Sequence, residues 1–119
     1  MAKYDEMYLL PIPKKNLTAY VKMAKITSKL FMNHGALSYA EYESSDHGKN
    51  GPLLLSGRLK PKAGEMLICS TIGYRSEKHR DQVVARVMKD PKFAKLMESP
   101  PLFKYARMGF GGFKRLLNA

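Results

Sequence analysis

The sequence has a single cysteine and no long hydrophobic run. Cys69 has no second thiol with which to form an intramolecular disulfide, and its place in the apolar segment 66–72 favours a buried structural thiol. No apolar stretch approaches the roughly 20 residues that a membrane-spanning helix needs. The first residues, Met1 to Glu6, lack the basic-then-apolar order of a secretory signal. We therefore predict a cytoplasmic protein with no membrane partner.

Motifs for metal binding and for common catalytic chemistry are also missing. The histidines His34, His47 and His79 show no H-x-x-x-H spacing and no carboxylate at ligand spacing, so we predict no metal site. No G-x-S-x-G segment supports hydrolase chemistry. The glycines of segment 107–113 have the wrong spacing for a dinucleotide-binding fingerprint and do not open a helix. We predict no cofactor, and whether the protein is an enzyme stays open.

Acidic residues are scarce, with 10 Asp and Glu against 21 Lys and Arg, which gives a net charge of +11. No acid lies between Glu6 and Glu41, whereas that stretch contains Lys14, Lys15, Lys22, Lys25 and Lys29. Such a positive field attracts phosphates and other anionic groups. One alternative function is therefore a basic module for nucleic acid or an acidic protein partner. Nucleic acid is disfavoured, because segment 65–74 lacks the alternating exposed aromatics that stack bases.

Apolar periodicity predicts four strands and two main helices in one domain that spans residues 1–119. We expect strands over 4–12, 36–43, 65–74 and 105–117, and helices over 14–33 and 76–89, with a short helix restarting at Asp90–Pro91. The polar segment from Ser44 to Gly64 is predicted to be a long loop with a short apolar anchor. Gly35 suits the left-handed position just past the end of the first helix.

This order of elements is the split βαβ, or ferredoxin-like, arrangement. It is an α+β fold in which the order βαββαβ builds a four-stranded antiparallel sheet with two main helices on one face. Segments 4–12 and 65–74 are apolar on both sides. The uncovered sheet face would then be an apolar patch larger than a monomer normally exposes. We predict a homodimer in which two such faces pack together.

The segment Arg107 to Phe113 places three glycines inside a predicted strand. Glycine weakens a strand interior and marks a bend, a bulge or a close approach of another group. In strand register, Gly109 and Gly111 share a face with Arg107 and Phe113. Because the two glycines have no side chains, the space above them would form the floor of a small pocket. The alternative is a strand thinned for close packing.

Further candidates for this pocket come from the arginine itself, the tyrosines and one histidine. Arg107 would bind a carboxylate or enol oxygen, or instead pair with Glu41 or Glu43 on a neighbouring strand. The tyrosines that we expect to line the same cavity are Tyr8, Tyr39 and Tyr74. Tyrosine in strands also serves ordinary packing. His34 would face the mouth of a barrel, or would interact with the helix C-terminal dipole.

The residues also resemble a known family, the YbaA-like bacterial proteins, which form a domain of unknown function (1428). The resemblance rests on Pro13, Ala19 to Ala24, Phe31 to Leu37, Tyr74 to Ser76, Arg80-Asp81, Met88 to Pro91, Arg107-Met108 and Gly111 to Phe113. It implies a dimeric α+β barrel, the class that also includes small cofactor-free monooxygenases and haem-degrading enzymes. It implies no activity, and segment 44–62 departs from the family pattern.

Three functions therefore remain open. The first is binding of a small apolar or enolisable molecule in a barrel cavity. The second is the basic binding module described above. The third is a cofactor-free monooxygenase-like or isomerase-like enzyme that uses the same cavity.

Overall fold

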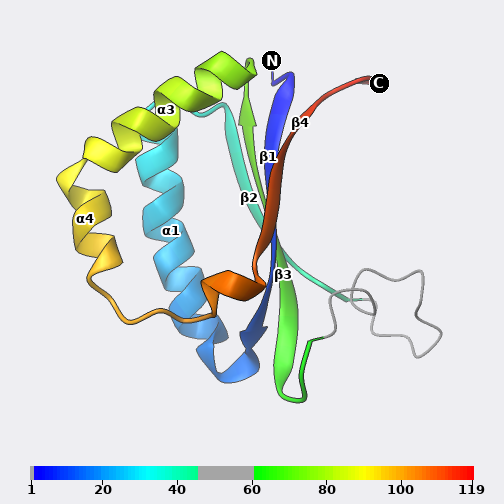
Figure 1. Cartoon of the computed structure of the whole chain (residues 1–119), viewed down its shortest axis with the longest axis vertical. Coiled ribbons are helices and arrows are strands. Elements are labelled where there is room, and N and C mark those ends of the chain that lie inside the picture. Colours follow the sequence, from blue (N-terminus) through cyan, green and yellow to red (C-terminus); the bar gives the residue numbers. More distant parts are fainter. Residues whose placement is uncertain (1, 46–60) are drawn as a thin grey trace.

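A computed structural model describes residues 2–45 and 61–119 (Figure 1). Their main elements follow the predicted order: β1 (Tyr4–Pro13), α1 (Leu17–Asn33), β2 (Ser38–Glu43), β3 (Glu65–Tyr74), α3 (Glu77–Lys89), α4 (Pro91–Met97) and β4 (Gly109–Lys114). Short 3-10 turns η1 (Lys14–Asn16) and η3 (Tyr105–Arg107) precede α1 and β4. In this part of the chain no helix is long and apolar enough to cross a membrane.

The strands form one antiparallel sheet in the order β2-β3-β1-β4. The two long strands, β1 and β3, lie at its centre and pair from Tyr4 opposite Tyr74 to Pro13 opposite Glu65. Helices α1, α3 and α4 lie on one side of the sheet, and none of the described helices lies on the other (Figure 1). The predicted ferredoxin-like α+β fold is confirmed.

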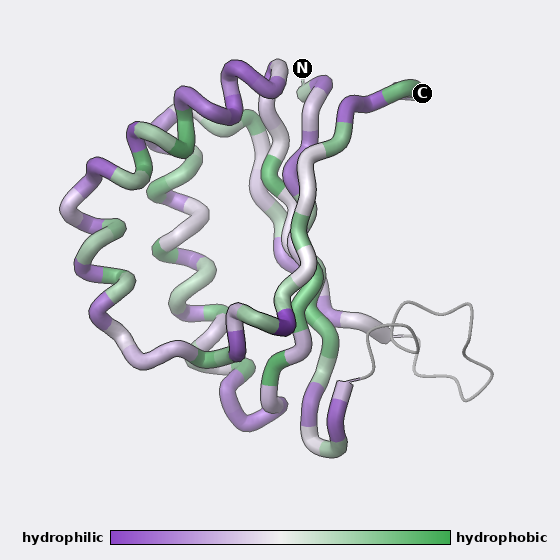
Figure 2. The backbone as a smooth tube through the Cα atoms, viewed as in Figure 1, coloured by the Kyte–Doolittle hydropathy of each residue, from purple (hydrophilic) through white to green (hydrophobic). Residues whose placement is uncertain are grey.

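The core lies between the sheet and the helices. Even-numbered residues of β1 and β3 point to this side, and they pack with α1 and α3 in two clusters. The first cluster contains Tyr4, Leu30, Ala36, Ile72, Tyr74, Val83 and Val87, and the second contains Leu10, Ile12, Tyr20, Ala24, Met66 and Ile68. Figure 2 shows hydrophobic and hydrophilic residues alternating along α1 and α3, as expected for helices with one buried side.

The local signals at the helix ends behave as predicted. Gly35 has φ +108°, a left-handed conformation that glycine adopts without a side-chain clash, and it ends α1. The Ser76 hydroxyl accepts the His79 amide at the start of α3, and the Asp90 carboxylate accepts the Lys92 amide at the start of α4. Each cap satisfies a backbone amide in the first turn of its helix, which has no partner within the helix.

Several predicted boundaries were wrong by a few residues. Helix α1 begins at Leu17, because residues 14–16 form the tighter turn η1 directly after Pro13. Strand β2 begins at Ser38, since the backbone of residues 34–36 is still completing the turn after α1 and only the Leu37 amide reaches β3, at the Gly73 carbonyl. Most of the predicted loop from Ser44 to Gly64 lies outside the described residues.

The last strand is shorter than predicted, at Gly109–Lys114 instead of 105–117. It pairs with β1 only between Tyr4 and Leu9. Beyond Leu9, β1 continues through Pro11 and Pro13, which have no amide hydrogen to donate to a ladder. Residues 105–107 instead form η3, so the prediction that Arg107 lies in the strand was wrong.

Candidate functional site

A cavity of about 730 Å³ lies between the helices and the β1–β4 half of the sheet; we call it the helix-side cavity. Its apolar wall includes Met23, Phe31, Val84, Met88, Phe93, Met97, Met108 and Phe110. Helices α1, α3 and α4 all contribute to this wall, because each turns an apolar stripe toward the sheet. The volume is that of a typical small-molecule site.

The helix-side cavity has a polar end formed by Glu6, Tyr8 and Arg80. Glu6 and Tyr8 are two residues apart on β1 and so face the same side. Arg80, in the first turns of α3, donates to the Glu6 carboxylate at 2.8 Å, and the Glu6 side chain is only 7% exposed. The Tyr8 hydroxyl donates to the other Glu6 oxygen. Burial first, and then Glu6, raises the pKa of Tyr8, so the phenol keeps its proton.

Arg80 is itself held in place from several sides. Its Nε donates to Asp81 at 2.7 Å, and its guanidinium lies 5.3 Å from the centre of the Tyr4 ring. A cation over an aromatic face is favourable, and more so where water is excluded. The arginine is thus oriented toward Glu6 before any ligand arrives.

A smaller chamber of about 140 Å³ continues the helix-side cavity beneath α1. The residues that line both spaces are Tyr8, Met23, Thr27, Phe31 and Met108. The far wall of the chamber holds Tyr20, Tyr39, Glu41 and Ser70. Tyr8 therefore stands between a larger apolar space and a second polar group.

That second polar group is centred on the Glu41 carboxylate. It accepts the hydroxyl protons of Tyr20 at 2.8 Å and Tyr39 at 2.7 Å, and also that of Ser70. Burial raises the pKa of both tyrosines, and the Glu41 charge raises them further, although the Ser70 hydrogen bond opposes the shift at Tyr20. Both phenols remain neutral hydrogen-bond donors.

The structure brings two of the predicted site residues together: Tyr8 and Tyr39 both line the smaller chamber. Tyr74 is fully buried in the core, where its ring meets His79 edge-on at 5.9 Å. Its hydroxyl has no hydrogen-bond partner, and burial followed by the Glu6 charge raises its pKa. Tyr74 therefore belongs to the first core cluster and does not line the helix-side cavity.

The predicted glycine pocket does not form where we expected it. Gly109, Gly111 and Phe113 face the opposite, uncovered side of the sheet, opposite Leu9, Met7 and Asp5 in the β1 register. Phe110 faces the helix-side cavity instead and stacks on Tyr8 with ring centres 5.7 Å apart. The period-two alternation of β4 thus separates the glycines from the tyrosines.

Close packing accounts for one of the three glycines of β4, Gly112. A Cβ atom there would come within 1.8 Å of the Tyr4 hydroxyl oxygen, so the strand is thinned for close packing at this point. Nothing lies within 4 Å of a Cβ placed on Gly109, and only the Phe113 ring approaches one on Gly111. The close-packing alternative therefore holds for one of the three glycines.

The two charged candidates have structural partners. Arg107 forms an ion pair at 2.6 Å with Glu65, and not with Glu41 or Glu43 as we considered. The pair joins η3 to the beginning of β3, and this Arg107 contact first, and then the Lys62 amide, lowers the pKa of Glu65. The prediction failed because it assumed that Arg107 lay in strand register.

His34 closes the end of α1. Its Nε2 lies 2.7 Å from the Asp90 carboxylate, which also caps α4. This contact first, and then the Lys92 amide, lowers the pKa of Asp90. The histidine links two helix ends and does not reach the helix-side cavity.

Sequence reasoning missed Glu6, Glu41 and Arg80 as site residues. A signal was present: on the buried face, Glu6 lies two residues from both Tyr4 and Tyr8, and Glu41 lies two residues from Tyr39. An acid in such a position must find donors within the core. Within residues 2–45 and 61–119, no group of three or more His, Cys, Asp and Glu side chains is placed to hold a metal ion.

Comparisons with solved structures agree with this fold. A NIPSNAP family protein of unknown function from Agrobacterium tumefaciens superimposes with a TM-score of 0.64 at 16% identity, over 96% of this chain and 88% of the other. A protein from an uncultured marine organism, described as a dimeric ferredoxin-like protein, superimposes over the full length of both chains with a TM-score of 0.58 at 12% identity. At these identities the likeness concerns the fold alone.

Sequence comparisons identify the family. The uncharacterized protein YbaA of Escherichia coli K12 is 30% identical over 116 residues, which cover 98% of each chain. The family model described as "Protein of unknown function (DUF1428)" matches residues 3–104, from β1 to just before η3. The chain therefore belongs to the DUF1428 family, as the resemblance of its residues to YbaA-like proteins predicted.

Proposed function

We propose that the helix-side cavity binds a small apolar molecule that carries one carbonyl, enol or hydroxyl oxygen. The observation that supports this proposal is an apolar space of about 730 Å³ with Glu6, Tyr8 and Arg80 at one end. Apolar walls provide the affinity of such sites, and a few placed polar groups orient the ligand. The methionines among the wall residues adapt to ligands of different shape.

The polar end favours a ligand oxygen that accepts a hydrogen bond. The Tyr8 proton is already donated to Glu6, whereas a guanidinium has five N–H donors. Arg80 directs Nη1 to Glu6 and Nε to Asp81, while its Nη2 lies 3.8 Å from Glu77, beyond hydrogen-bond distance, so the Nη2 donors remain for a ligand oxygen. A carbonyl oxygen at this end would accept a hydrogen bond from the guanidinium, while the apolar body of the ligand would lie along the methionines.

Binding is a better proposal than turnover for this cavity. Glu6 is held by Arg80 and by the Tyr8 hydroxyl, so its carboxylate is engaged before a ligand arrives. The monooxygenase-like and isomerase-like alternatives stay predictions.

Methionine-methyl NMR tests the proposal. We would titrate 2-naphthol, an apolar bicyclic ring with one hydroxyl, into protein labelled at the methionine methyl carbons. Saturable shifts are expected at Met23, Met88, Met97 and Met108, which line the cavity, but not at Met7 on the uncovered face. The absence of saturable shifts at those four methyls, or shifts confined to Met7, would overturn the proposal.

Two tyrosine variants sharpen the test. The Tyr8 oxygen donates its proton to Glu6 but can still accept the naphthol hydroxyl proton, so Tyr8→Phe should weaken 2-naphthol binding about fivefold, the effect of one neutral hydrogen bond. Tyr42→Phe is the matched control, because Tyr42 lies on the uncovered face, and it should leave the affinity unchanged. Equal effects of the two substitutions would place the naphthol elsewhere.

We also propose that the uncovered face of the sheet forms a homodimer. Met7, Tyr42 and Phe113 on this face are 38%, 55% and 53% exposed, beside the half-buried Leu9 and Cys69. Covering exposed apolar side chains of this kind is favourable. The marine structural neighbour is described as a dimeric ferredoxin-like protein, which supports the same arrangement here.

The basic-module function and the cytoplasmic location stay predictions. The lysines that would carry a basic module, Lys22, Lys25 and Lys29, are exposed on α1. Exposed lysines of this kind bind anions weakly and with a strong dependence on salt. A measured affinity for generic DNA that does not fall between low and physiological salt would speak for a more specific nucleic-acid surface.

A further inference from the structure

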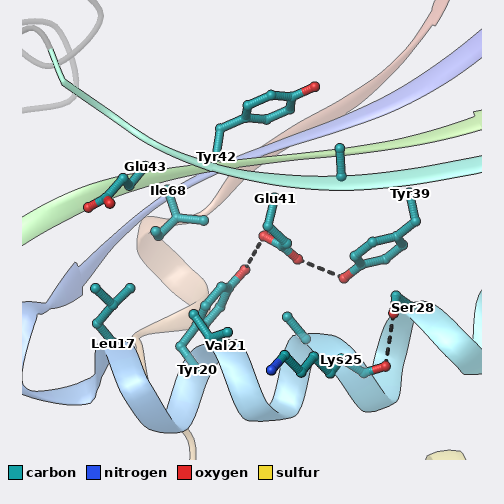
Figure 3. A pocket seen from close by; sticks show the side chains of 12 residues that line it. Leu17, Tyr20, Val21, Lys25, Ser28, Tyr39, Glu41, Tyr42, Glu43 and Ile68 are labelled. Atoms are coloured by element: carbon teal, nitrogen blue, oxygen red, sulfur yellow. Dashed lines mark hydrogen bonds between the residues drawn. The ribbon is translucent and has the colours of Figure 1, made fainter.

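A second pocket lies between α1 and the edge strand β2, and it shares Tyr20, Tyr39 and Glu41 with the wall of the smaller chamber (Figure 3). We call it the α1–β2 pocket. It has a volume of about 400 Å³, and Tyr20 and Lys25 of α1 and Tyr39 and Glu41 of β2 contribute to its wall. In Figure 3 the Glu41 carboxylate points from β2 toward α1, between the two tyrosine hydroxyls.

The Glu41 carboxylate retains capacity for one more hydrogen bond. One oxygen, Oε1, accepts from Tyr20 and Ser70, and the other, Oε2, accepts from Tyr39. A carboxylate has about four lone-pair positions, so one remains at Oε2. The two phenols donate their protons to Glu41, and their oxygens therefore keep lone pairs of their own.

Glu41 differs in its partners from the other buried and half-buried acids of the described sheet and helices. Asp5, Glu6, Glu65 and Asp90 each lie against an arginine or a histidine. Among the described residues, Glu41 has hydroxyl donors and no cationic side chain within ion-pair distance. Hydroxyls satisfy its hydrogen bonds but leave its negative charge without a counterion, in a chain whose net charge is +11.

The remaining charges of the pocket do not supply that counterion. Lys25 lines the same pocket from α1, but it forms no ion pair with Glu41. Glu43, two residues along β2, adds a second negative charge at the wall. The two acids outnumber the single lysine, so the pocket favours a positive group in an otherwise basic protein.

We propose that the α1–β2 pocket binds the primary ammonium group of a small organic amine. A primary ammonium has three N–H donors, and the acceptors available here are Glu41 Oε2 and the oxygens of Tyr20 and Tyr39. The tyrosine rings add the attraction of an aromatic face for a cation. The argument for this ammonium site does not use the apolar ligand proposed for the helix-side cavity, although Tyr20, Tyr39 and Glu41 also line the smaller chamber.

Three small probes that share a benzyl group test whether binding requires a primary ammonium. Benzylamine has a charge and three N–H donors, benzyltrimethylammonium has the charge without donors, and benzyl alcohol has neither charge nor the same donors. Calorimetric titration at physiological salt should show benzylamine binding at least about tenfold more tightly than the other two, as expected for charge-assisted hydrogen bonds. Equal affinity for benzyl alcohol, or no saturable binding of benzylamine, would overturn the proposal. Equal affinity for benzyltrimethylammonium would overturn its assignment to a primary ammonium.

Two neighbouring glutamates provide a matched pair of variants. Glu41→Gln should weaken benzylamine binding about tenfold or more, whereas Glu43→Gln should weaken it less than about threefold, because the exposed Glu43 contributes only screened charge. Equal losses would contradict the proposal and assign the attraction to diffuse surface charge. If Glu41→Gln does not fold, Tyr39→Phe removes one acceptor and should still weaken binding of benzylamine more than that of benzyl alcohol.

Discussion

The two faces of this sheet differ in a way that a simple picture of an apolar core does not suggest. The face beneath the helices contains two acids, Glu6 and Glu41, with their hydroxyl and guanidinium partners. The uncovered face presents Met7, Leu9 and Tyr42 instead, and its one buried acid among the described residues, Asp5, is paired with Arg115, directly after the edge strand β4. The covered face thus combines an apolar core with hydrogen-bonded acids, while the other face leaves apolar side chains where the isolated chain would meet water.

The difference between the two faces of the sheet indicates that they suit different roles. Buried polar groups cost stability unless they are hydrogen-bonded, so they persist where they orient a ligand or specify packing. An exposed apolar patch costs little once a second copy covers it. The helix-covered face is therefore suited to ligand binding, and the uncovered face is suited to association.

The largest expected effect comes from placing a charge on the uncovered face. Met7→Asp would bury an uncompensated carboxylate from each copy in the proposed dimer interface, and should raise the dimer dissociation constant by about a hundredfold or more. Light scattering at micromolar concentration should then give the mass of one chain. Met32→Asp is the control, because Met32 is similarly exposed, at 44% against 38%, but lies on α1. A single-chain mass for the unmodified protein would refute the dimer.

The next effect concerns the buried ion pair beneath the helices. Arg80→Met leaves the Glu6 carboxylate buried without its cation and should lower the free energy of unfolding by about 3 kcal/mol. The control Lys78→Met, on the exposed side of α3, should stay within about 0.5 kcal/mol. Urea denaturation measures both variants. The double variant Glu6→Gln with Arg80→Met should recover part of the loss, and a double variant as unstable as Arg80→Met would show that Arg80 acts by packing alone.

A smaller effect distinguishes the faces within β4 itself. Gly112→Ala forces the Tyr4 ring to move and should cost about 2 kcal/mol of stability, the usual penalty of an overpacked core. Gly109→Ala meets no atom within 4 Å and should change stability by less than about 1 kcal/mol. Thermal unfolding of the two variants compares the positions directly. Equal destabilisation would contradict the assignment of the two glycines to opposite faces.

The smallest effect should come from the contact at the end of α1. His34 and the Lys92 amide lower the pKa of Asp90 below its usual 3.8, so the stability from this carboxylate is fully present above 3.8 and is lost as the pH falls from there through the lowered pKa of the folded protein. Asp90→Asn keeps the helix cap but removes the charge. The stability difference between the two proteins should therefore be larger at pH 5 than at pH 3. Equal differences at the two pH values, measured by urea midpoints, would exclude the charge effect.

The fold was largely predictable from local patterns. Alternation identified β1 and β3, helical spacing identified α1 and α3, and Gly35, Ser76 and Asp90 marked helix ends. These features depend on backbone sterics and on hydrogen bonds between residues close in the chain. Their positions are therefore readable one segment at a time.

The candidate site was less predictable. We selected Arg107 and the β4 glycines because their spacing assumed a strand that begins at 105, whereas strand pairing begins at Gly109. We also overlooked Glu6, since its partner Arg80 lies 74 residues away in the sequence. A contact between such distant residues depends on how α3 docks on the sheet, which no local pattern specifies.

By itself, the sequence determined the order of elements, the apolar character of both faces of β1 and β3, and the excess of basic residues. These follow from side-chain periodicity and composition. Tertiary structure alone decided which acids are buried, which donors meet them, and that Tyr8 and Phe110 face the helices while Phe113 faces away. The physical reason is that burial, ion pairing and cavity shape arise between segments far apart in the chain, where register and helix docking set every distance.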